Sequence, residues 1–581
     1  MVACAVKVEI AFDSGFTTPD VDRTWTDVTG RASLGPAAIT WGRSDQFATC
    51  EPLTCSIALA NEDGALTPRN ASSPYYPNVK LDRPLRITVT PSGGSASVRF
   101  VGYVDAWPRS YPMGTDLGTV GVYLTATSRM GRLGERGTKF YSDLIEYSLA
   151  AGAIAVFPLD EPEGARRAVS VNSDHELKAA GSGARVRFSG SSALLRGGQH
   201  LTSQLILGSD YSIALSFLST SRGGRDILPI QLQQDAATLG AANDGVWHRL
   251  VMTETGGTTA GFDLYLDDAP IPFAITAVRT SNLVLGLLDP SARVRDVVVY
   301  DSKISSGDVT TDYDAFNGGY ADSTDARLVR YASFVGIPSG EVDADAGAVL
   351  MGATDIEGLS PVDAFRVCES TEGGVLTDAR DGSLRLIGRG ARYYSSPTVT
   401  LDMEAEEVGA DYAPTLDRFS LRNDVTGTNA ATSMGQIHAG SGYSRNYTDA
   451  DSVAEYGTQG SSVEVNAIDD TEAYAAAGWM VNSWAEPADR VPSISVDLLP
   501  LNLAQTVAAM AVFVGDRVRL ENRTAQDANS SEDFFAEGGT ETWAADAAGL
   551  VFNVSPLGLN DSVLIFDAPG HNWDAGYHFA R

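Results

Sequence analysis

Cysteine is scarce in this chain: Cys4, Cys50, Cys55 and Cys368 are the only four among 581 residues. Four cysteines are too few for the disulfide framework that holds small secreted domains together. The sequence leaves open whether Cys50 and Cys55 pair or stay reduced within strands. No C-x-x-C motif or Cys/His cluster is present, so no zinc site is predicted.

Long apolar runs are lacking as well. No run approaches the roughly 18 residues that a membrane-spanning helix requires. The first residues, MVACAVK, lack the charged and apolar parts of a signal peptide. We therefore expect a protein without a membrane span that is made and folded in a cytoplasm.

Basic residues are few. Lys and Arg number 42 against 74 Asp and Glu, which gives a net charge of −32. The imbalance is strong in residues 401–581, which hold 28 acids, 8 arginines and no lysine. Binding to nucleic-acid phosphates needs clustered Lys and Arg and is not expected. The acids either serve solubility or form a surface that repels DNA and lets it slide past.

What is present indicates a β-rich protein of several domains. Hydrophobic residues make up 43% of the chain and glycines number 58, which suits turn-rich globular domains. A single core rarely exceeds about 250–300 residues, so the chain should divide. Apolar and polar residues alternate with the period of a strand in residues 8–12, 85–89, 98–104 and 120–126.

In the rest of the chain, the pattern of predicted strands and helices changes twice. Residues 140–310 contain their own set of predicted strands, at 211–217, 247–252, 262–266, 282–287 and 294–300. Residues 322–395 are mixed: a helix is predicted over 326–335, and Ser360 followed by Pro361 marks the start of another helix. A hairpin that turns at 381–382 follows. After residue 396 we predict strands at 493–499, 512–520 and 563–566 and helices at 451–456 and 470–484.

The N-terminal block resembles minor tail proteins of long-tailed phages that infect actinobacteria. The similarity lies in the order and spacing of short motifs between residues 39 and 108. These are ITWGR (39–43), CSIALANEDG (55–64), LTP (66–68), PYYPN (74–78), RPLRI (83–87) and FVGYVDAWP (100–108). It resumes in residues 322–338 and 361–389, which include STEGG (370–374) and RDG (380–382), and in SVAEYG (452–457) and VGDRV (514–518).

That resemblance implies a hub protein of the tail tip or baseplate. It implies a homotrimer in which each chain supplies two tube-like β-barrel or sandwich domains, expected at 1–138 and 399–581. A small α+β hub domain is expected at 311–398. The implied partners are the distal tail protein, the tape measure and other tip proteins, and genomic DNA would pass without specific binding. The implied location is the tail tip of the virion.

Residues 139–310 resemble an inserted laminin-G or concanavalin A-like jelly-roll sandwich. The landmarks are FPLDE (157–161), then DGVWHRL (244–250) followed by LYLDD (264–268), and finally VVVYDSKIS (297–305). The resemblance implies a lectin-like domain that contacts a glycan of the host surface. It leaves calcium open as a cofactor, although no loop of alternating oxygen ligands is visible.

No catalytic, cofactor or metal site is predicted. Trp247 is expected in the sandwich core with His248 on the same strand, and Asp267 with Asp268 is expected to form a hairpin turn. The other polar candidates are expected to be solvent-exposed without a catalytic or binding role. They are the acidic group Asp160, Glu161 and Glu163 and the isolated His438 and His571. Subunit contact and core packing both stay open for Tyr75, Tyr76 and Trp107.

Three functions follow from these patterns. The leading hypothesis is a non-enzymatic structural protein that forms a hub ring closing the tail tube and displays the lectin-like domain. The first alternative is a receptor-binding adhesin at the tip that does not line the tube. The second is a tail-associated glycosidase, which should show a cleft with two carboxylates roughly 5–9.5 Å apart.

Overall fold

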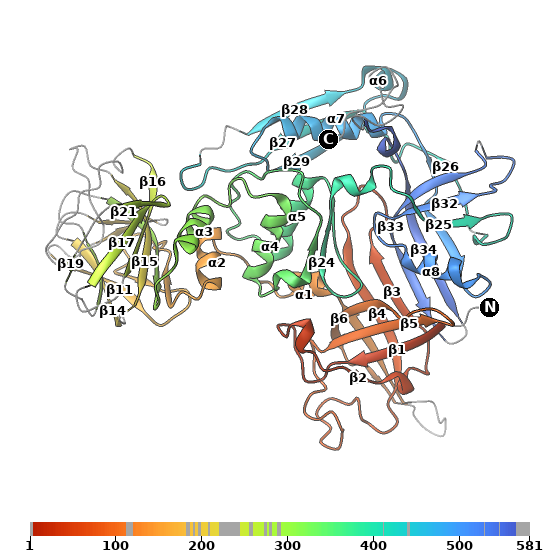
Figure 1. Ribbon diagram of the computed structural model, residues 1–581, viewed down its shortest axis with the longest axis horizontal. Helices are drawn as coiled ribbons and strands as arrows, with labels where there is room; N and C mark the ends of the chain where they lie inside the picture. The colour runs from red at the N-terminus through yellow and green to blue at the C-terminus, as the bar shows by residue number, and fades with distance from the viewer. Residues whose placement is uncertain are drawn as a thin grey trace.

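The computed structural model shows a mainly β protein of several parts (Figure 1). Among the described residues, no helix is both long and apolar enough to cross a bilayer. The structure describes all residues except 1–3, 112–119, 182–185, 190–191, 196–198, 207–209, 220–244, 255–259, 272–275, 278–281, 287–291, 411, 438–441, 528, 545–546 and 565–581.

The N-terminal block is an antiparallel sheet whose strands alternate buried and exposed residues. In β4 the side chains of Leu53, Cys55, Ile57 and Leu59 point into the core, as the period of two predicts. The strands are β1 (Cys4–Ile10), β2 (Thr26–Asp27), β3 (Ala37–Gly42), β4 (Glu51–Ala60), β5 (Pro84–Pro91), β6 (Ser97–Ala106), β7 (Arg109–Ser110) and β8 (Gly121–Thr127).

The C-terminal block continues the same sheet. Strand β3 pairs antiparallel with β33, so that 13 described strands of both blocks form one sheet over one hydrophobic core. A Cβ on Gly538 would lie 2.4 Å from the Arg43 carbonyl, so only glycine allows this approach. The elements added here are β25 (Pro397–Asp402), β31 (Ser493–Asp497), α8 (Leu503–Ala511), β32 (Arg517–Glu521), β33 (Glu532–Trp543) and β34 (Ala548–Pro556).

A smaller layer lies beside this sheet and is drawn at the top of Figure 1. Helix α7 (Thr471–Trp484) covers one face of a sheet made of β27 (Asp424–Asn429), β28 (Tyr443–Thr448) and β29 (Gly460–Val465). Gly427 makes the close packing possible, because a Cβ there would lie 2.0 Å from the Ala473 carbonyl. The short helix α6 (Ala450–Tyr456) lies between β28 and β29 in the chain, and β26 (Thr415–Leu416) pairs with β30 (Asp489–Arg490) in a separate ladder.

The inserted block stands apart at the left of Figure 1. We call the rest of the chain, before and after the insertion, the scaffold. It is a sandwich of a 4-stranded and a 9-stranded sheet, counted over the described residues, around its own core. Its strands are β9 (Ala155–Phe157), β10 (Arg167–Val169), β11 (Glu176–Gly181), β12 (Arg187–Phe188), β13 (Ala193–Leu195), β14 (Gln199–Ile206), β15 (Ser212–Ser219), β16 (Trp247–Glu254), β17 (Ala260–Leu266), β18 (Ala269–Ile271), β19 (Thr276–Ala277), β20 (Asn282–Gly286) and β21 (Ala292–Tyr300).

Residues 311–398, between the insertion and the C-terminal block, are α+β, and we use the name hub block for them as a label. Helix α5 (Pro361–Glu372) starts as predicted: Ser360 and Asp363 form a capping box around Pro361, and Gly373 ends the helix with φ 67°. It packs with α1 (Arg129–Glu135) and α4 (Thr324–Phe334) over a small sheet. The strands of that sheet are β22 (Val342–Ala344), β23 (Val375–Asp378) and β24 (Leu384–Ile387).

Some predicted elements differ from the structure. The strand expected over 512–520 exists only as β32, because residues 503–511 form α8 and the chain then turns at Gly515 with φ 85°. Half of the strand expected at 563–566, residues 565 and 566, lies outside the described residues. All four cysteines are buried and free, so Cys50 and Cys55 do not pair in this structure.

A candidate binding cleft at the base of the inserted sandwich

The sandwich is joined to the scaffold by two neck helices, α2 (Asp143–Ala150) and α3 (Ser306–Phe316). Arg249 of β16 fixes α3 through a bidentate pair with Asp312, with Nε–Oδ2 2.6 Å and Nη2–Oδ1 2.9 Å. Both side chains are 1% exposed. Burying two charges is tolerated only with such complete pairing, so the sandwich and its neck form one packed unit.

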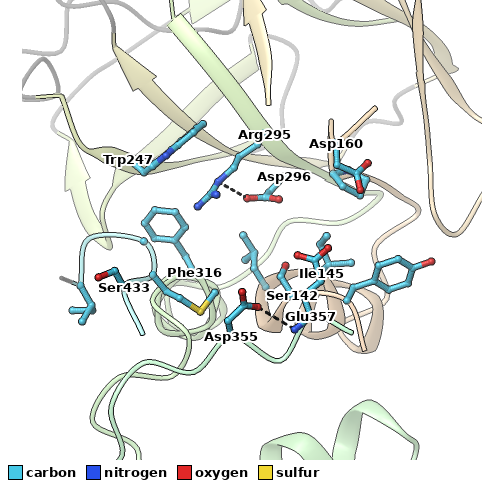
Figure 2. A pocket seen from close by; sticks show the side chains of 16 residues that line it. Ser142, Ile145, Asp160, Trp247, Arg295, Asp296, Phe316, Asp355, Glu357 and Ser433 are labelled. Carbon is cyan, nitrogen blue, oxygen red and sulfur yellow. Dashed lines mark hydrogen bonds and ion pairs between the residues drawn. The ribbon is translucent and has the colours of Figure 1, made fainter. Parts of the chain in front are cut away.

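A cleft of about 440 Å³ opens where the sandwich, the neck, the hub and the loop between β27 and β28 meet (Figure 2). Trp247, Arg295, Asp296 and Asp160 line it from the sandwich side, and Figure 2 shows them facing the residues of the neck and hub. Its walls combine apolar side chains with charged and polar ones. The other lining residues are Tyr141, Ser142, Leu144, Ile145, Pro158, Phe316, Asp355, Glu357, Ser433, Met434, Gly435 and Ile437.

A β-bulge shapes the sandwich side of the cleft. The register between β15 and β21 shifts between Ala214 and Ser216, and Asp296 adopts a positive φ of 51°. Bulges commonly redirect side chains in this way. Asp296 Oδ2 lies 3.1 Å from Nε of Arg295, whose guanidinium stacks on Trp247 with Cζ 4.3 Å from the ring centroid. The bulge therefore places an aromatic ring, a cation and a carboxylate together.

Carboxylates from separate segments converge on the cleft. Asp160 and Asp296 come from the sandwich, and Asp355 and Glu357 come from the loop after β22. Burial raises the pKa of Asp296. Burial and then the like charges of Asp355, Asp160 and Asp296 raise the pKa of Glu357. The cleft is thus an acidic, partly apolar hollow, suited to a ligand with hydroxyl or cationic groups and one apolar face.

The prediction that Trp247 packs in the sandwich core is wrong. The ring is half-buried and packs at the neck against the cluster of Leu144, Ala315 and Phe316. Its position as the first residue of β16 carries it past the end of the core. The prediction that His248 lies on the same strand as Trp247 is confirmed, and the His248 side chain is buried at 4% exposure.

His248 links the sandwich to the scaffold. Its Nδ1 lies 2.6 Å from Asp267 Oδ2 and 3.0 Å from Nε2 of Gln436. Tyr313 of α3 reinforces the link, because its hydroxyl donates to Gln436 Oε1 at 2.9 Å. The hairpin turn predicted at Asp267 and Asp268 is confirmed, with φ 51° and 68° between β17 and β18.

The other candidates have ordinary roles. Glu161 accepts a hydrogen bond from the Val169 amide, and Glu163 forms an exposed pair with Arg187. Within the described residues, no group of three or more His, Cys, Asp or Glu side chains could hold a metal ion. His438 and His571 lie outside the described residues.

The aromatic candidates of the N-terminal block divide between core and surface. Trp107 is buried and donates its Nε1–H to the Lys80 carbonyl, and Tyr75 stacks on Phe12 with centroids 4.1 Å apart. Tyr76 is 54% exposed, so it alone of the three presents its ring to solvent.

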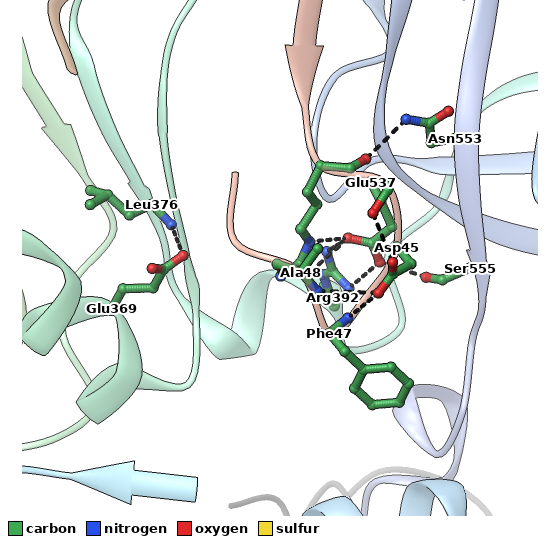
Figure 3. A network of polar contacts seen from close by, with 11 residues as sticks. Asp45, Phe47, Ala48, Glu369, Leu376, Arg392, Glu537, Asn553 and Ser555 are labelled. Carbon is green, nitrogen blue, oxygen red and sulfur yellow. Dashed lines mark hydrogen bonds and ion pairs between the residues drawn. The ribbon is translucent and has the colours of Figure 1, made fainter. Parts of the chain in front are cut away.

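A second polar feature, far from the cleft, joins the scaffold blocks. Glu537 of β33 is fully buried, and Figure 3 shows it beside Arg392. Arg43 follows β3 and lies 2.7 Å from Glu537 Oε2, while Arg392 of the hub binds both carboxylate oxygens at 2.9 Å. Ser555 donates a further hydrogen bond at 2.5 Å. Although burial acts in the opposite direction, the two guanidiniums lower the pKa of Glu537 to about 2.

Residues of three motifs that are far apart in the sequence meet next to Glu537 and its two arginines. Trp41 of β3 stacks on Phe513 with centroids 5.0 Å apart. The Arg380 guanidinium lies over both rings, 5.4 Å from that of Trp41 and 4.7 Å from that of Phe513. Arg380 also pairs with Glu541, which holds Arg99 through two bonds of 2.6 and 2.9 Å. The interrupted scaffold is therefore closed by specific buried contacts.

The fold is that of a mainly β protein with several sheets, and comparison with solved structures finds two kinds of similar protein. Over 96% of this chain and 99% of the other, it is similar to the 43 kDa tail protein of prophage MuSo2 from Shewanella oneidensis, at 10% identity and TM-score 0.40. No family model and no curated protein matches the chain.

Other similar structures are receptor-binding domains of botulinum neurotoxins. A binding domain of neurotoxin DC, solved in complex with SialylT, matches 30% of this chain at 8% identity and TM-score 0.23. A serotype D ligand-binding domain, solved with N-acetylneuraminic acid, matches 31% at 10% identity and TM-score 0.23. The chain spans about half the length of these domains, 54% of each. Identities this low do not transfer a function.

Proposed function

We propose that this chain is a structural protein of the tail tip of a long-tailed phage. Three copies would form a hub ring that closes the tail tube, with the inserted sandwich displayed toward the host surface. The convergence of the tail-type motifs supports this most. ITWGR (39–43), RDG (380–382) and VGDRV (514–518) are far apart in sequence, yet Trp41, Arg380 and the segment around Val514 pack together.

The arrangement of the insertion fits the same proposal. The blocks before and after it rejoin in one sheet, so the scaffold is complete without the sandwich. The inserted sandwich, on its neck of two helices, can project outward while the scaffold contacts the distal tail protein, the tape measure and other tip proteins. The net charge of −32 would let DNA pass without specific binding.

Cryo-electron microscopy of virions that carry this chain tests the ring. Density for three copies around the tube axis, with the sandwiches on the outer side, is the expected result. Six copies in the ring would contradict the proposal. Copies attached beside the tube without closing a ring would favour the adhesin alternative instead.

The cleft gives the host-binding role a location. We propose that it accepts part of a cell-surface glycan, because a half-buried indole beside carboxylates and an arginine can stack on a sugar ring and bind its hydroxyls. The full chain would be tested on an array of actinobacterial cell-wall glycans. Trp247→Ala should reduce binding at least about tenfold, the worth of roughly 1.4 kcal/mol. Tyr123→Ala, at an exposed tyrosine of the scaffold, is the matched control and should bind normally. Equal binding by both variants would move the glycan site elsewhere.

We also propose that the chain is not an enzyme, although the cleft gives the glycosidase alternative a place to be tested. One carboxylate is engaged locally, since Asp355 accepts the Glu357 amide at 3.0 Å, and Asp296 is paired with Arg295. We expect no reducing sugar to be released from host cell walls by the purified chain. Release that Glu357→Gln abolishes would overturn this proposal.

A further inference from the structure

Strand β26 lies on the opposite side of the scaffold from the sandwich (Figure 1). At its ladder with β30, aromatic, aliphatic and arginine side chains that are exposed or half-buried form a surface. We call it the Arg418 surface, and it consists of Phe47, Leu416, Arg418, Phe419 and Arg422. Leu416 is 67% exposed and Phe419 is 41% exposed, and Arg418 between them is also exposed. Adjacent exposed apolar residues of this kind commonly mark an interaction site.

Ring and cation contacts hold the surface together. Phe47, from the loop between β3 and β4, lies 6.3 Å from Phe419 between ring centroids. The Arg422 guanidinium stacks on Phe47 with Cζ 4.2 Å from the ring centroid. Arg490 stacks on Phe419 at 4.8 Å. These contacts fix the side chains before any partner arrives, which lowers the entropic cost of binding.

Two of these arginines have no acidic partner. Arg418 and Arg422 donate to backbone carbonyls, and neither forms an ion pair within 4.0 Å among the described residues. Asp45 acts on Arg422 only from farther away, and burial lowers the pKa of Arg422. Residues 401–581 hold 28 acids and 8 arginines, and Arg517, Arg519 and Arg523 in the same region are all paired.

We propose that the Arg418 surface binds an acidic face of a second copy of this chain. A net charge of −32 makes any neighbouring copy a source of carboxylates for the two unpaired guanidiniums. The surface is cationic and therefore not complementary to itself, so a two-fold dimer through it would place like charges opposite each other. The contact must be head-to-tail, and head-to-tail contacts form a ring when the rotation between neighbouring copies closes. This inference rests on the proposed hub ring and names the surface that builds it.

Sedimentation velocity of the purified full chain tests the proposal, at low and at high salt. We expect the wild type to form trimers that dissociate as salt rises, because exposed charges are screened. Arg418→Glu should weaken association at least about tenfold, since it places like charges across the contact. Leu416→Ser should weaken it without any change in charge. Arg187→Glu reverses the same charge at an exposed residue of the sandwich and should leave association unchanged.

Trimers of Arg418→Glu and Leu416→Ser as stable as the wild type would overturn this surface while leaving the proposed ring intact. A wild-type chain that stays monomeric at every concentration would overturn the contact between copies, and the number of copies in virions would then judge the ring separately. Wild-type binding to duplex DNA that Arg418→Glu abolishes, with no change in mass, would assign the surface to nucleic acid instead. Unchanged melting of both variants shows that folding is not the cause.

Discussion

Replacing Glu537 by Gln should destabilise the scaffold strongly while preserving the shape of the side chain. The carboxylate of Glu537 neutralises Arg43 and Arg392 at 2.7–2.9 Å in a fully buried position. The fall of its pKa from 4.5 to about 2 corresponds to about 3 kcal/mol at neutral pH. Removing one partner of a buried ion pair costs about 3–5 kcal/mol, because the remaining charges are left unpaired. Both routes give the same magnitude.

The pH dependence has a definite sign. Because the pKa of Glu537 is lowered in the folded state, the unfolded chain binds more protons between pH 4.5 and about 2. The stabilisation is complete above that window and is lost as the pH falls through it. The difference in stability between wild type and Glu537→Gln should therefore be largest near neutral pH and shrink in acid.

Urea unfolding combined with hydrogen exchange of the β3 and β33 peptides measures this difference. Exchange identifies the transition that belongs to the scaffold, because a chain of several domains need not unfold in one step. Glu163→Gln is the matched control, since its pair with Arg187 is 70% and 64% exposed and should contribute at most about 1 kcal/mol. Equal losses in both variants, or a loss at Glu537 that does not shrink in acid, would refute the reasoning.

Two further substitutions test the neck and the shared sheet. Asp312→Asn should lower the unfolding free energy of the sandwich by about 3–5 kcal/mol, because it leaves the buried Arg249 unpaired; calorimetry should show no such loss for Asp263→Asn at the exposed pair with Lys303. Gly538→Ala should cost the scaffold about 1–3 kcal/mol through contact with backbone atoms. Gly134→Ala meets nothing within 4 Å, so an equal loss of melting temperature there would contradict the steric argument.

Local patterns made much of the fold predictable. The capping residues Ser360 and Asp363 and the alternation in β4 act within a few residues of chain, and the structure has a helix and a strand there. Helix α8 was missed although Asn502 and Gln505 form a capping box at its start. Its Ala-rich sequence runs directly into the apolar residues before β32, and periodicity alone does not separate a short buried helix from a strand.

The cleft and the Arg418 surface were not predictable for a different reason. The cleft unites Trp247, Asp296 and Glu357, and only the docking of the sandwich on the hub brings these three together. A tryptophan at the start of a core strand gives the same sequence signal whether it packs inward or reaches past the core. In the same way, Arg418 and Arg517 are identical as residue types, yet Arg517 is buried and pairs with Asp533 and Asp561, whereas Arg418 is exposed and forms no ion pair among the described residues. Unpaired charge is a property of the folded neighbourhood, so the sequence alone does not show which arginines lack an acidic partner.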